Sequence, residues 1–464
     1  MVATAACAAN RPNVLLLVAD DLRAELNCLG SSHIQSSNLD RLAADGRLFS
    51  RAYCQQAVCN PSRASFITGL RPDTLQVWDL RTHFRKRHPD HPTLPQFFRQ
   101  HGYETRCIGK LFHNTGNMGD PQSWSADALF FEGPHSADTV TARRKNTQRK
   151  GDIPVVEHFE VDDDAYWDGR IADAATGALR ELQDRPFFLA VGFWRPHLPF
   201  VAPKKYWDLY DPKQLPPPTS WTAPADCPPI ALHDYKEIRG YALMPETYPI
   251  QPDFAARLRH GYYASISFLD EQIGKVLGAL DRLGLRDNTI VAFISDHGFH
   301  LAEHGLWCKT SCFEYDARVP MIISAPGMKQ PGTTSASLAE LVDLYPTLAD
   351  LAGLRAPANL EGTSLRPILD DPRATVKPGA YTQHPRPAYY RGKPEVMGVS
   401  VATKNFRYTE WRDFATGAVS AREFYNHRKE LNENRNEADN PKFAEDIKEG
   451  ARLLKQQFPL NADP

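Results

Sequence analysis

The sequence has no apolar run long enough to cross a membrane. Its longest such run, residues 14–19, has the length of a strand, whereas a spanning helix needs roughly 20 apolar residues. The net charge of −2 gives no electrostatic reason to bind nucleic acid or an anionic membrane surface. The 42% hydrophobic and 24% charged content are typical of a globular protein, and we expect neither a membrane span nor a nucleic-acid partner.

Cysteine pairs of the CxxC type are also missing. The eight cysteines are scattered, and the pairs Cys54/Cys59 and Cys308/Cys312 lack the His/Cys partners of a zinc site. We expect most of them to be free thiols, with one or two disulfides if the protein is exported. Residues 1–10 are small and alanine-rich, without the charged and long apolar segments of a complete signal peptide. The chain has no internal repeat.

Apolar segments of strand length alternate with helical segments from residue 13 to about residue 385. The predicted strands are 13–19, 103–108, 186–193, 289–295 and 319–324. The predicted helices are 38–45, with Asn38 as its cap, and 61–68, 94–101, 164–182, 254–283 and 341–351. This alternation predicts an α/β fold in which helices cover both faces of a large, mostly parallel sheet.

The pattern changes after residue 387. Residues 396–403 and 406–411 form a predicted hairpin around Lys404-Asn405, and a polar helix is predicted near 442–457. We therefore expect a catalytic domain at 1–388 and a smaller C-terminal α+β domain at 389–464. Two proline-rich loops, 215–229 and 248–252, have the length of lids or binding surfaces.

Acidic residues follow two of the predicted strands. Asp20 and Asp21 end the first, and Asp296 and His297 end the strand at 289–295. Ligands of open α/β sheets bind beyond the carboxyl ends of the strands, where three carboxylates repel one another unless a cation neutralises them. Each aspartate alone is more often a cap or turn residue. Together they predict one divalent cation, best Ca²⁺.

Cys59-Asn60-Pro61-Ser62-Arg63, followed by Thr68-Gly69 and Arg71-Pro72, resembles the modification signature of type I sulfatases of the alkaline phosphatase superfamily. His297 in place of asparagine resembles the iduronate-2-sulfatase branch of that family. The resemblance spans almost the whole chain. Its other segments are Asp20-Asp21, 109–113, 191–200, 295–298, 341–354, 361–365, 383–387 and 407–411.

The resemblance implies a sulfuric ester hydrolase in which Cys59 is oxidised to formylglycine, whose hydrate attacks sulfur. It implies that Asp20, Asp21, Asp296, His297 and the modified Cys59 hold the cation. The remaining roles that it implies are these: Lys110 and Arg63 steady the nucleophile, His197 protonates the leaving alcohol, Lys309 binds the sulfate, and His113 removes a proton so that sulfate leaves. Such chemistry needs cations and proton donors around an ester, and these residue types supply both.

The iduronate branch acts on the 2-O-sulfate of uronic acids, so a sulfated glycosaminoglycan or related polysaccharide is the expected substrate. A uronate carboxylate would need further cations, for which Arg81, Arg85, Arg195 and Arg386 are candidates. Trp307 or Trp78 would stack on a sugar face, although tryptophan is more often a core residue. The resemblance also implies a formylglycine-generating maturation enzyme as a partner, and export to a periplasmic, secreted or lysosome-like location.

Two other functions remain open at this point. Phosphonate monoester and phosphodiester hydrolases of the same superfamily also use formylglycine, and Cys59 to Arg63 does not separate them from sulfatases. A catalytically inactive glycan-binding homologue would result if Cys59 stayed a thiol.

Overall fold

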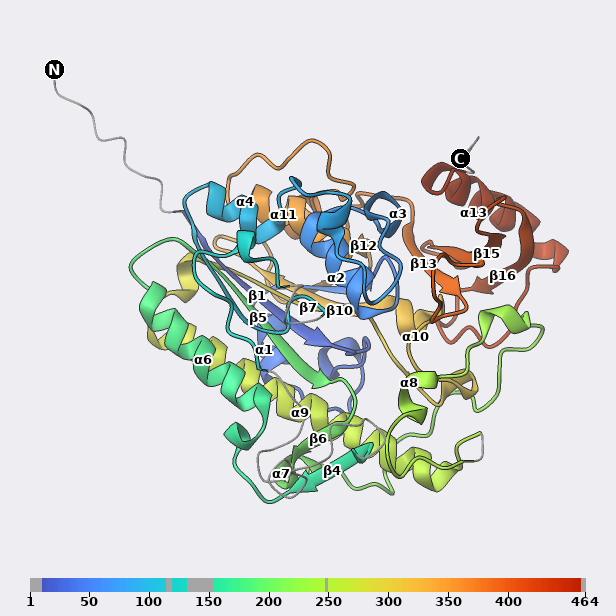
Figure 1. Cartoon of the computed structure of the whole chain (residues 1–464), viewed down its shortest axis with the longest axis horizontal. Helices are drawn as coiled ribbons and strands as arrows, with labels where there is room; N and C mark the ends of the chain where they lie inside the picture. Colours follow the sequence, from blue (N-terminus) through green and yellow to red (C-terminus); the bar gives the residue numbers. More distant parts are fainter. Residues whose placement is uncertain (1–10, 114–118, 132–152, 247–248, 460–464) are drawn as a thin grey trace.

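The computed structural model describes residues 11–113, 119–131, 153–246 and 249–459. Its main sheet has the strand order β11-β2-β10-β7-β1-β5-β3, with β12 also paired to β2 (Figure 1). These strands are β1 Asn13–Asp20, β2 Arg47–Tyr53, β3 Glu104–Gly109, β5 Phe187–Pro196, β7 Thr289–Ser295, β10 Arg318–Ser324, β11 Thr333–Ser335 and β12 Ala339–Glu340. Only β10 runs antiparallel to its neighbours, so the predicted mostly parallel sheet is confirmed.

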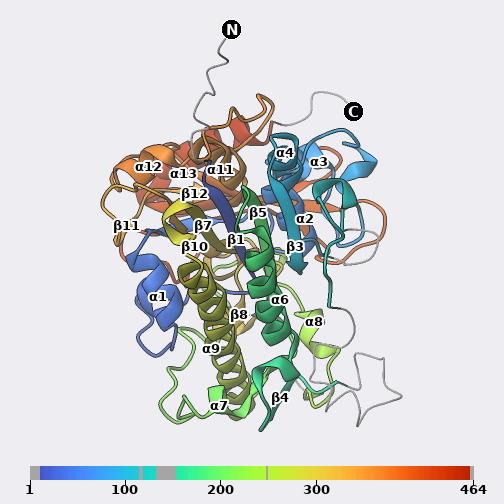
Figure 2. The same ribbon diagram turned by 90° about the vertical axis from the view of Figure 1, so that its left-hand side faces the viewer.

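Strand β1 is buried on both faces, as its unbroken apolar sequence predicts. Leu15 and Leu17 pack into the core on one side of the sheet, and Val14, Leu16 and Val18 into the core on the other. The first side is covered by α1 Ser37–Ala44, α6 Trp167–Leu182 and α9 Pro252–Arg282, and α6 and α9 run side by side in Figure 2. The second is covered by α2 Cys59–Thr68, α4 Leu94–Gln100, α11 Leu344–Leu351 and α12 Arg366–Asp370.

One strand was missed, and one local expectation was wrong. Strand β2, which was not predicted, enters the main sheet between β10 and β11. Asn38 does not cap α1, because that helix begins at Ser37. The carboxylate of Asp270 on α9 instead accepts the backbone N–H groups of Asn38 (3.0 Å) and Leu39 (2.8 Å), so the cap comes from another helix.

A second sheet has the order β13-β14-β15-β16 and is entirely antiparallel. Its strands are β13 Ala380–Arg386, β14 Val396–Ala402, β15 Phe406–Asp413 and β16 Val419–Asn426, and α13 Ala444–Gln457 packs on it. The predicted hairpin is therefore confirmed as β14–β15. The sheet begins upstream of the expected boundary at residue 388.

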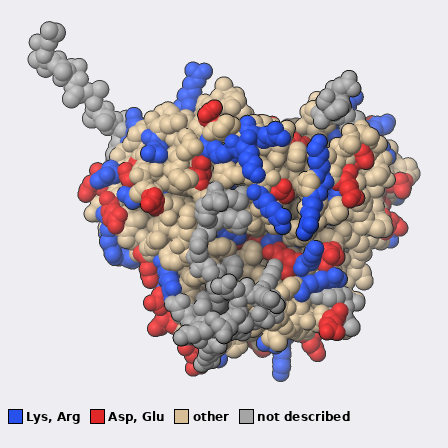
Figure 3. All heavy atoms as spheres, in the orientation of Figure 1, with Lys and Arg blue, Asp and Glu red and all other residues tan. Residues whose placement is uncertain are grey.

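The remaining short elements lie in the connections. They are α3 Pro72–Leu75, β4 Val156–Phe159, β6 Phe200–Pro203, α7 Lys204–Trp207, α8 Lys236–Arg239, β8 His300–Leu301, β9 Trp307–Cys308 and α10 Glu314–Ala317. No described helix is both long and apolar enough to span a bilayer. None of the seven cysteines within the described ranges forms a disulfide, and Cys7 lies outside those ranges. Acidic and basic side chains are interspersed on the face shown in Figure 3, in keeping with the small net charge.

Candidate active site

The acidic cluster forms where two neighbouring parallel strands end. β1 pairs with β7 so that Ala19 lies opposite Ser295, which brings Asp20 and Asp21 beside Asp296 and His297. All four side chains are completely buried. Asp21 has a φ of 66°, a conformation that costs a non-glycine residue energy and is concentrated at functional sites. Its backbone N–H donates to Oδ1 of Asp296 at 3.1 Å, which ties the two strand ends together.

Cys59 is the first residue of α2, and its thiol points into this cluster. Its Sγ lies 3.3 Å from Nε2 of His297, 3.7 Å from Oδ1 of Asp20 and 4.0 Å from Oδ1 of Asp21. Burial raises the pKa of the Cys59 thiol well above its ordinary value. The unmodified side chain is therefore a protonated thiol rather than a reactive thiolate.

The acidic residues suit a bound cation. Ligand atoms of Asp20, Asp21, Cys59 and His297 lie within 4.8 Å of one another. Nδ1 of His297 is 2.9 Å from the carbonyl oxygen of Gly298, an acceptor, which leaves Nε2 facing the carboxylates as a potential ligand. Oxygen-rich sets of this kind fit a hard divalent cation. The residues present thus fit the expected metal, and they do not by themselves distinguish Ca²⁺ from other divalent ions.

Arg63 and Lys110 neutralise part of the acidic charge. Arg63 lies one turn after Cys59 on α2, so its side chain emerges on the same helix face. It donates to Asp296 at 2.8 Å, to Asp20 at 3.0 Å and to the backbone carbonyl of Lys110 at 2.6 Å. The Lys110 ammonium, which follows β3, donates to Asp20. Burial alone would raise the pKa of Asp20, but Lys110 and Arg63 hold it well below its ordinary value.

Lys309 and His197 come to the same place from two other loops, and His113 comes from the loop after β3 that also carries Lys110. The Lys309 ammonium donates to both carboxylate oxygens of Asp21, at 2.9 and 2.8 Å. Nε2 of His197 lies 4.0 Å from Oδ2 of Asp21, and its Nδ1 is 2.6 Å from the carbonyl oxygen of Leu198. Burial and the nearby charge of Lys110 lower the pKa of His113 well below its ordinary value. The structure thus gathers all the catalytic and metal-ligand candidates at one sheet edge.

Glu237, on α8, belongs to this group and was missed from the sequence. Its Oε2 lies 2.8 Å from Nζ of Lys309, and its Oε1 lies 3.4 Å from Nε2 of His197. Burial alone would lower the pKa of Lys309, but Asp21 and Glu237 raise it well above its ordinary value. No motif marks Glu237, which lies on the four-residue helix α8 after the proline-rich segment 215–229.

A cleft of about 460 Å³ adjoins the site and is lined by Asp79, Arg81 and Tyr389 among other residues. Asn60, the residue after Cys59, donates to the backbone carbonyls of Asp79 at 2.8 Å and Thr82 at 2.9 Å. These bonds connect the wall of the cleft to the start of α2. Of the proposed substrate-binding arginines, Arg81 is therefore the one that is both exposed and lines a cleft.

Two of the residues expected to bind the sugar, Trp307 and Arg386, make structural contacts instead. Trp307 is only 1% exposed and packs into the core beneath the sheet, so it cannot stack on a sugar. Arg386 donates to the backbone carbonyls of Ile230, Thr310 and Ala231 at 2.8–2.9 Å and lies over the ring of Trp411. These contacts give Arg386 the role of fastening loops together. Arg195 similarly donates to the carbonyl of His197 at 2.7 Å and so fixes the backbone of that residue.

The comparisons with known proteins cover most of the chain. A family model described as Sulfatase matches residues 12–354, and one described as N-sulphoglucosamine sulphohydrolase, C-terminal, matches residues 302–458. Human iduronate 2-sulfatase is 35% identical, with 87% of this chain and 85% of that protein covered. A protein of Formosa agariphila named Sulfatase is 30% identical, with 96% and 86% covered.

Two solved structures share the fold. BT4656 in complex with D-glucosamine-2-N,6-O-disulfate has a TM-score of 0.78 at 23% identity, with 96% of this chain and 97% of that chain covered. A phosphonate monoester hydrolase from Silicibacter pomeroyi has the same TM-score and identity, with 96% and 94% covered. Since their sequences are so distant, these two structures support the architecture alone.

Proposed function

Because the chain belongs to the sulfatase family and is a sulfatase enzyme, we propose that it removes the 2-O-sulfate of a uronic acid in a glycosaminoglycan or related polysaccharide. The observation that carries the proposal is the position of Cys59, which faces the acidic cluster on one side and lies among the cations Lys110, Arg63 and Lys309. The choice of 2-O-sulfate is supported by the 35% identity to the iduronate 2-sulfatases of human and mouse.

Sulfatases generally use a metal ion and a formylglycine, and we propose both here. Asp20, Asp21, Asp296 and His297 would hold the cation together with position 59. When bound, the cation would polarise a sulfate oxygen, and the hydrated aldehyde at position 59 would supply the attacking hydroxyl. Lys110 and Arg63, which both donate to Asp20, would orient that hydroxyl.

The other groups are suited to handling protons and the sulfate charge. Lys309 would contact a sulfate oxygen, and His197 would give a proton to the sugar alcohol as it leaves. His113 would take the proton that must be removed before sulfate is released. Glu237 would act through these groups as a positioning residue, since it contacts both Lys309 and His197. Arg81 would meet a charged group of the sugar at the cleft.

The first test is mass spectrometry of the tryptic peptide 52–63, prepared after co-expression with a formylglycine-generating enzyme. Conversion of Cys59, with Cys54 as the unmodified control in the same peptide, is the expected result. The converted protein should release sulfate from a 2-O-sulfated uronate disaccharide faster than from a hexosamine 6-sulfate. The opposite preference would overturn the 2-O specificity, and a converted protein that releases no sulfate from any sugar would overturn the function.

Phosphonate or phosphodiester hydrolysis is the second candidate, because the phosphonate monoester hydrolase of Silicibacter pomeroyi has the same architecture. Matched aryl sulfate and phenylphosphonate esters would separate the two activities. A higher kcat/KM on the phosphonate would favour this alternative. Since sulfated polysaccharides lie outside cells, we also expect the enzyme to act outside the cytoplasm.

A further inference from the structure

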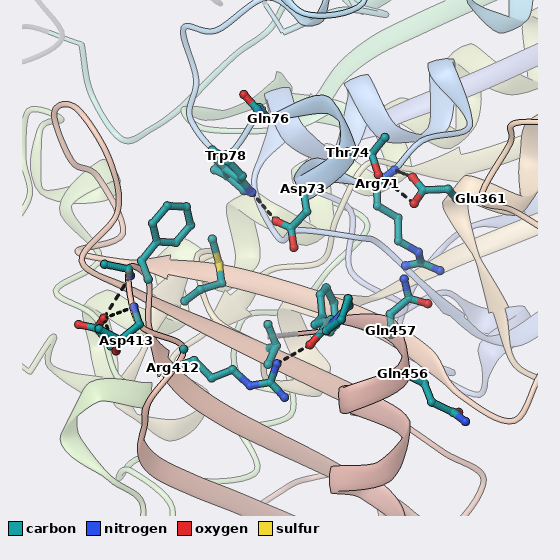
Figure 4. A pocket seen from close by; sticks show the side chains of 18 residues that line it. Arg71, Asp73, Thr74, Gln76, Trp78, Glu361, Arg412, Asp413, Gln456 and Gln457 are labelled. Carbon is teal, nitrogen blue, oxygen red and sulfur yellow. Dashed lines mark hydrogen bonds between the residues drawn. The ribbon is translucent and has the colours of Figure 1, made fainter. Parts of the chain in front are cut away.

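A second cavity lies at the seam between the large domain and the small sheet. Its volume is about 720 Å³, within the rough range of 300–1,000 Å³ that is usual for small-molecule sites. One wall comes from α3 and the residues after it, and the other from β14, the β15–β16 turn and the end of α13 (Figure 4). None of the residues proposed to act on the sulfate lines this seam cavity.

Two aromatic rings form part of its lining. Trp78, from the large domain, and Phe414, from the β15–β16 turn, meet edge to face at 5.2 Å between ring centres. Both are half-buried, so part of each ring remains accessible. Nε1 of Trp78 donates to Asp73 at 2.6 Å, which fixes the orientation of the indole. A fixed, partly exposed indole is an apolar surface of the kind against which the C–H face of a sugar ring packs.

The lining also includes three glutamine side chains. Gln76 stands on one side of the cavity, and Gln456 and Gln457 stand on α13 (Figure 4). Within the described residues, none of the three amides forms a hydrogen bond. Each offers one acceptor and two donors, which suits hydroxyl groups that both donate and accept.

Both arginines of the seam cavity are already paired with carboxylates. Arg71 donates to both carboxylate oxygens of Glu340, at 2.9 and 2.7 Å. Arg412 donates twice to Glu410, at 2.9 and 2.7 Å, and once to the carbonyl of Phe458 at 2.8 Å. A sulfate group bound here would compete with these carboxylates for the arginines and would face the acidic side chains of Asp73, Glu361 and Asp413, which also line the cavity. The lining therefore favours a hydroxyl-rich sugar over a sulfated one.

The seam cavity and the active-site cleft share one stretch of backbone. The carbonyl of Trp78 accepts the side-chain amide of Gln56 at 2.8 Å, and the carbonyl of Asp79 accepts that of Asn60 at 2.8 Å. Trp78 lines the seam cavity, whereas Asp79 and Arg81 line the cleft beside Cys59. Residues 78–81 therefore run from the lining of the seam cavity to the lining of the cleft.

We propose that the seam cavity is a subsite for an unsulfated or sparsely sulfated stretch of the same polysaccharide chain whose sulfate ester is hydrolysed beside Cys59. The identity of that chain rests on the proposed function. The subsite makes the enzyme prefer long substrates, because a chain that fills both cavities gains contacts that a disaccharide cannot make.

The experiment compares kcat/KM across a ladder of sulfated oligosaccharides from disaccharide to decasaccharide, for wild type, Trp78→Ala and Phe414→Ala. The readout is the ratio of kcat/KM for the longest and the shortest substrate within each protein, so a general loss of activity cancels. Wild type should show a ratio well above one. Each variant should lose roughly three- to tenfold of that ratio, the range of a single aromatic contact. Trp221→Ala, which removes a tryptophan that is 40% exposed and does not line the cavity, is the matched control.

A binding measurement makes the test independent of turnover. A desulfated, N-acetylated octasaccharide should bind wild type and Trp221→Ala in calorimetry, and should bind Trp78→Ala and Phe414→Ala at least several-fold more weakly. A wild-type ratio near one, or equal losses in Trp221→Ala, would overturn the subsite even if sulfate release from disaccharides stands. If no sugar sulfate is cleaved at all, the proposed function fails, and the octasaccharide still decides whether the cavity binds sugar.

Discussion

Replacing Glu237 by glutamine removes one negative charge from between two proposed catalytic groups while keeping the shape of the side chain. Lys309 retains its two contacts with Asp21, at 2.8 and 2.9 Å, and so stays in place. His197 loses the nearer of its two carboxylate neighbours, since Glu237 is 3.4 Å away and Asp21 is 4.0 Å away. The substitution should therefore act mainly through the proton donor of the leaving group.

The magnitude follows from the type of contact. A hydrogen bond to a charged group contributes about 1.5–3 kcal/mol, roughly twice a neutral one, so the amide should forfeit about 1 kcal/mol at this long distance. At about 1.4 kcal/mol per factor of ten, kcat on a sugar 2-sulfate should fall about fivefold with little change in KM. Hydrolysis of 4-nitrophenyl sulfate should change by less than about twofold, because nitrophenolate leaves without a proton.

The assay is steady-state kinetics of Glu237→Gln on both substrates, with Asp234→Asn as the matched control. Asp234 lies three residues away on the same segment, and its side chain is 62% exposed. Equal losses on the two substrates would refute a role in positioning His197 and place the effect on sulfate binding. Unchanged kinetics on both would refute any functional role of the contacts that Glu237 makes.

Three further predictions concern stability and the metal. Burial raises the pKa of Glu423 from 4.5 to about 7, so the folded state binds this proton more tightly than the unfolded state. The wild type should therefore lose up to about 3 kcal/mol of unfolding free energy between pH 4.5 and 8. Urea titrations at several pH values should show a smaller loss for Glu423→Gln. Arg407→Leu removes the arginine that pairs with both buried carboxylates, Glu314 and Glu433, and should cost about 3–5 kcal/mol by the same assay, whereas Arg452→Leu, at an exposed pair, should have little effect. Dialysis against a chelator should abolish sulfate release and lower the melting temperature, and Ca²⁺ should restore both; retention of full activity without divalent ions would contradict the metal site.

The parts of the site that the sequence predicts are those fixed by strand ends and by one helix. Asp20 and Asp296 follow unbroken apolar runs, and such runs become central strands whose ends converge. Cys59 and Arg63 are one helical turn apart, so their spacing alone places them on a common face of α2. Local pattern and tertiary position coincide at these points, whereas the roles of Cys59 and Arg63 come from the family resemblance alone.

The parts that the sequence does not predict depend on contacts between segments far apart in the chain. Asp270 caps α1 from more than two hundred positions away, and no local pattern indicates that Asn38 has no capping role. Glu237 reaches Lys309 from a short helix, α8, that lies far from Lys309 in the sequence. Trp307 is a residue of a type that can stack on sugars, but it lies on the short strand β9 and its side chain is buried in the core.

Substrate specificity depends on the difference between residues held in the buried cluster and residues on loops and short helices. The residues nearest Cys59 are held by buried ion pairs in which Asp20, Asp21 and Asp296 each contact at least one cation, so this part of the site has little freedom to change. Glu237, Arg81 and Trp78 instead lie on short helices and loops, where substitutions disturb less of the core. Sulfatases that share the acidic cluster can therefore differ in the sugar they accept. For this chain, the choice of sugar should be decided by α8 and by residues 78–81 rather than by the residues that carry the family resemblance.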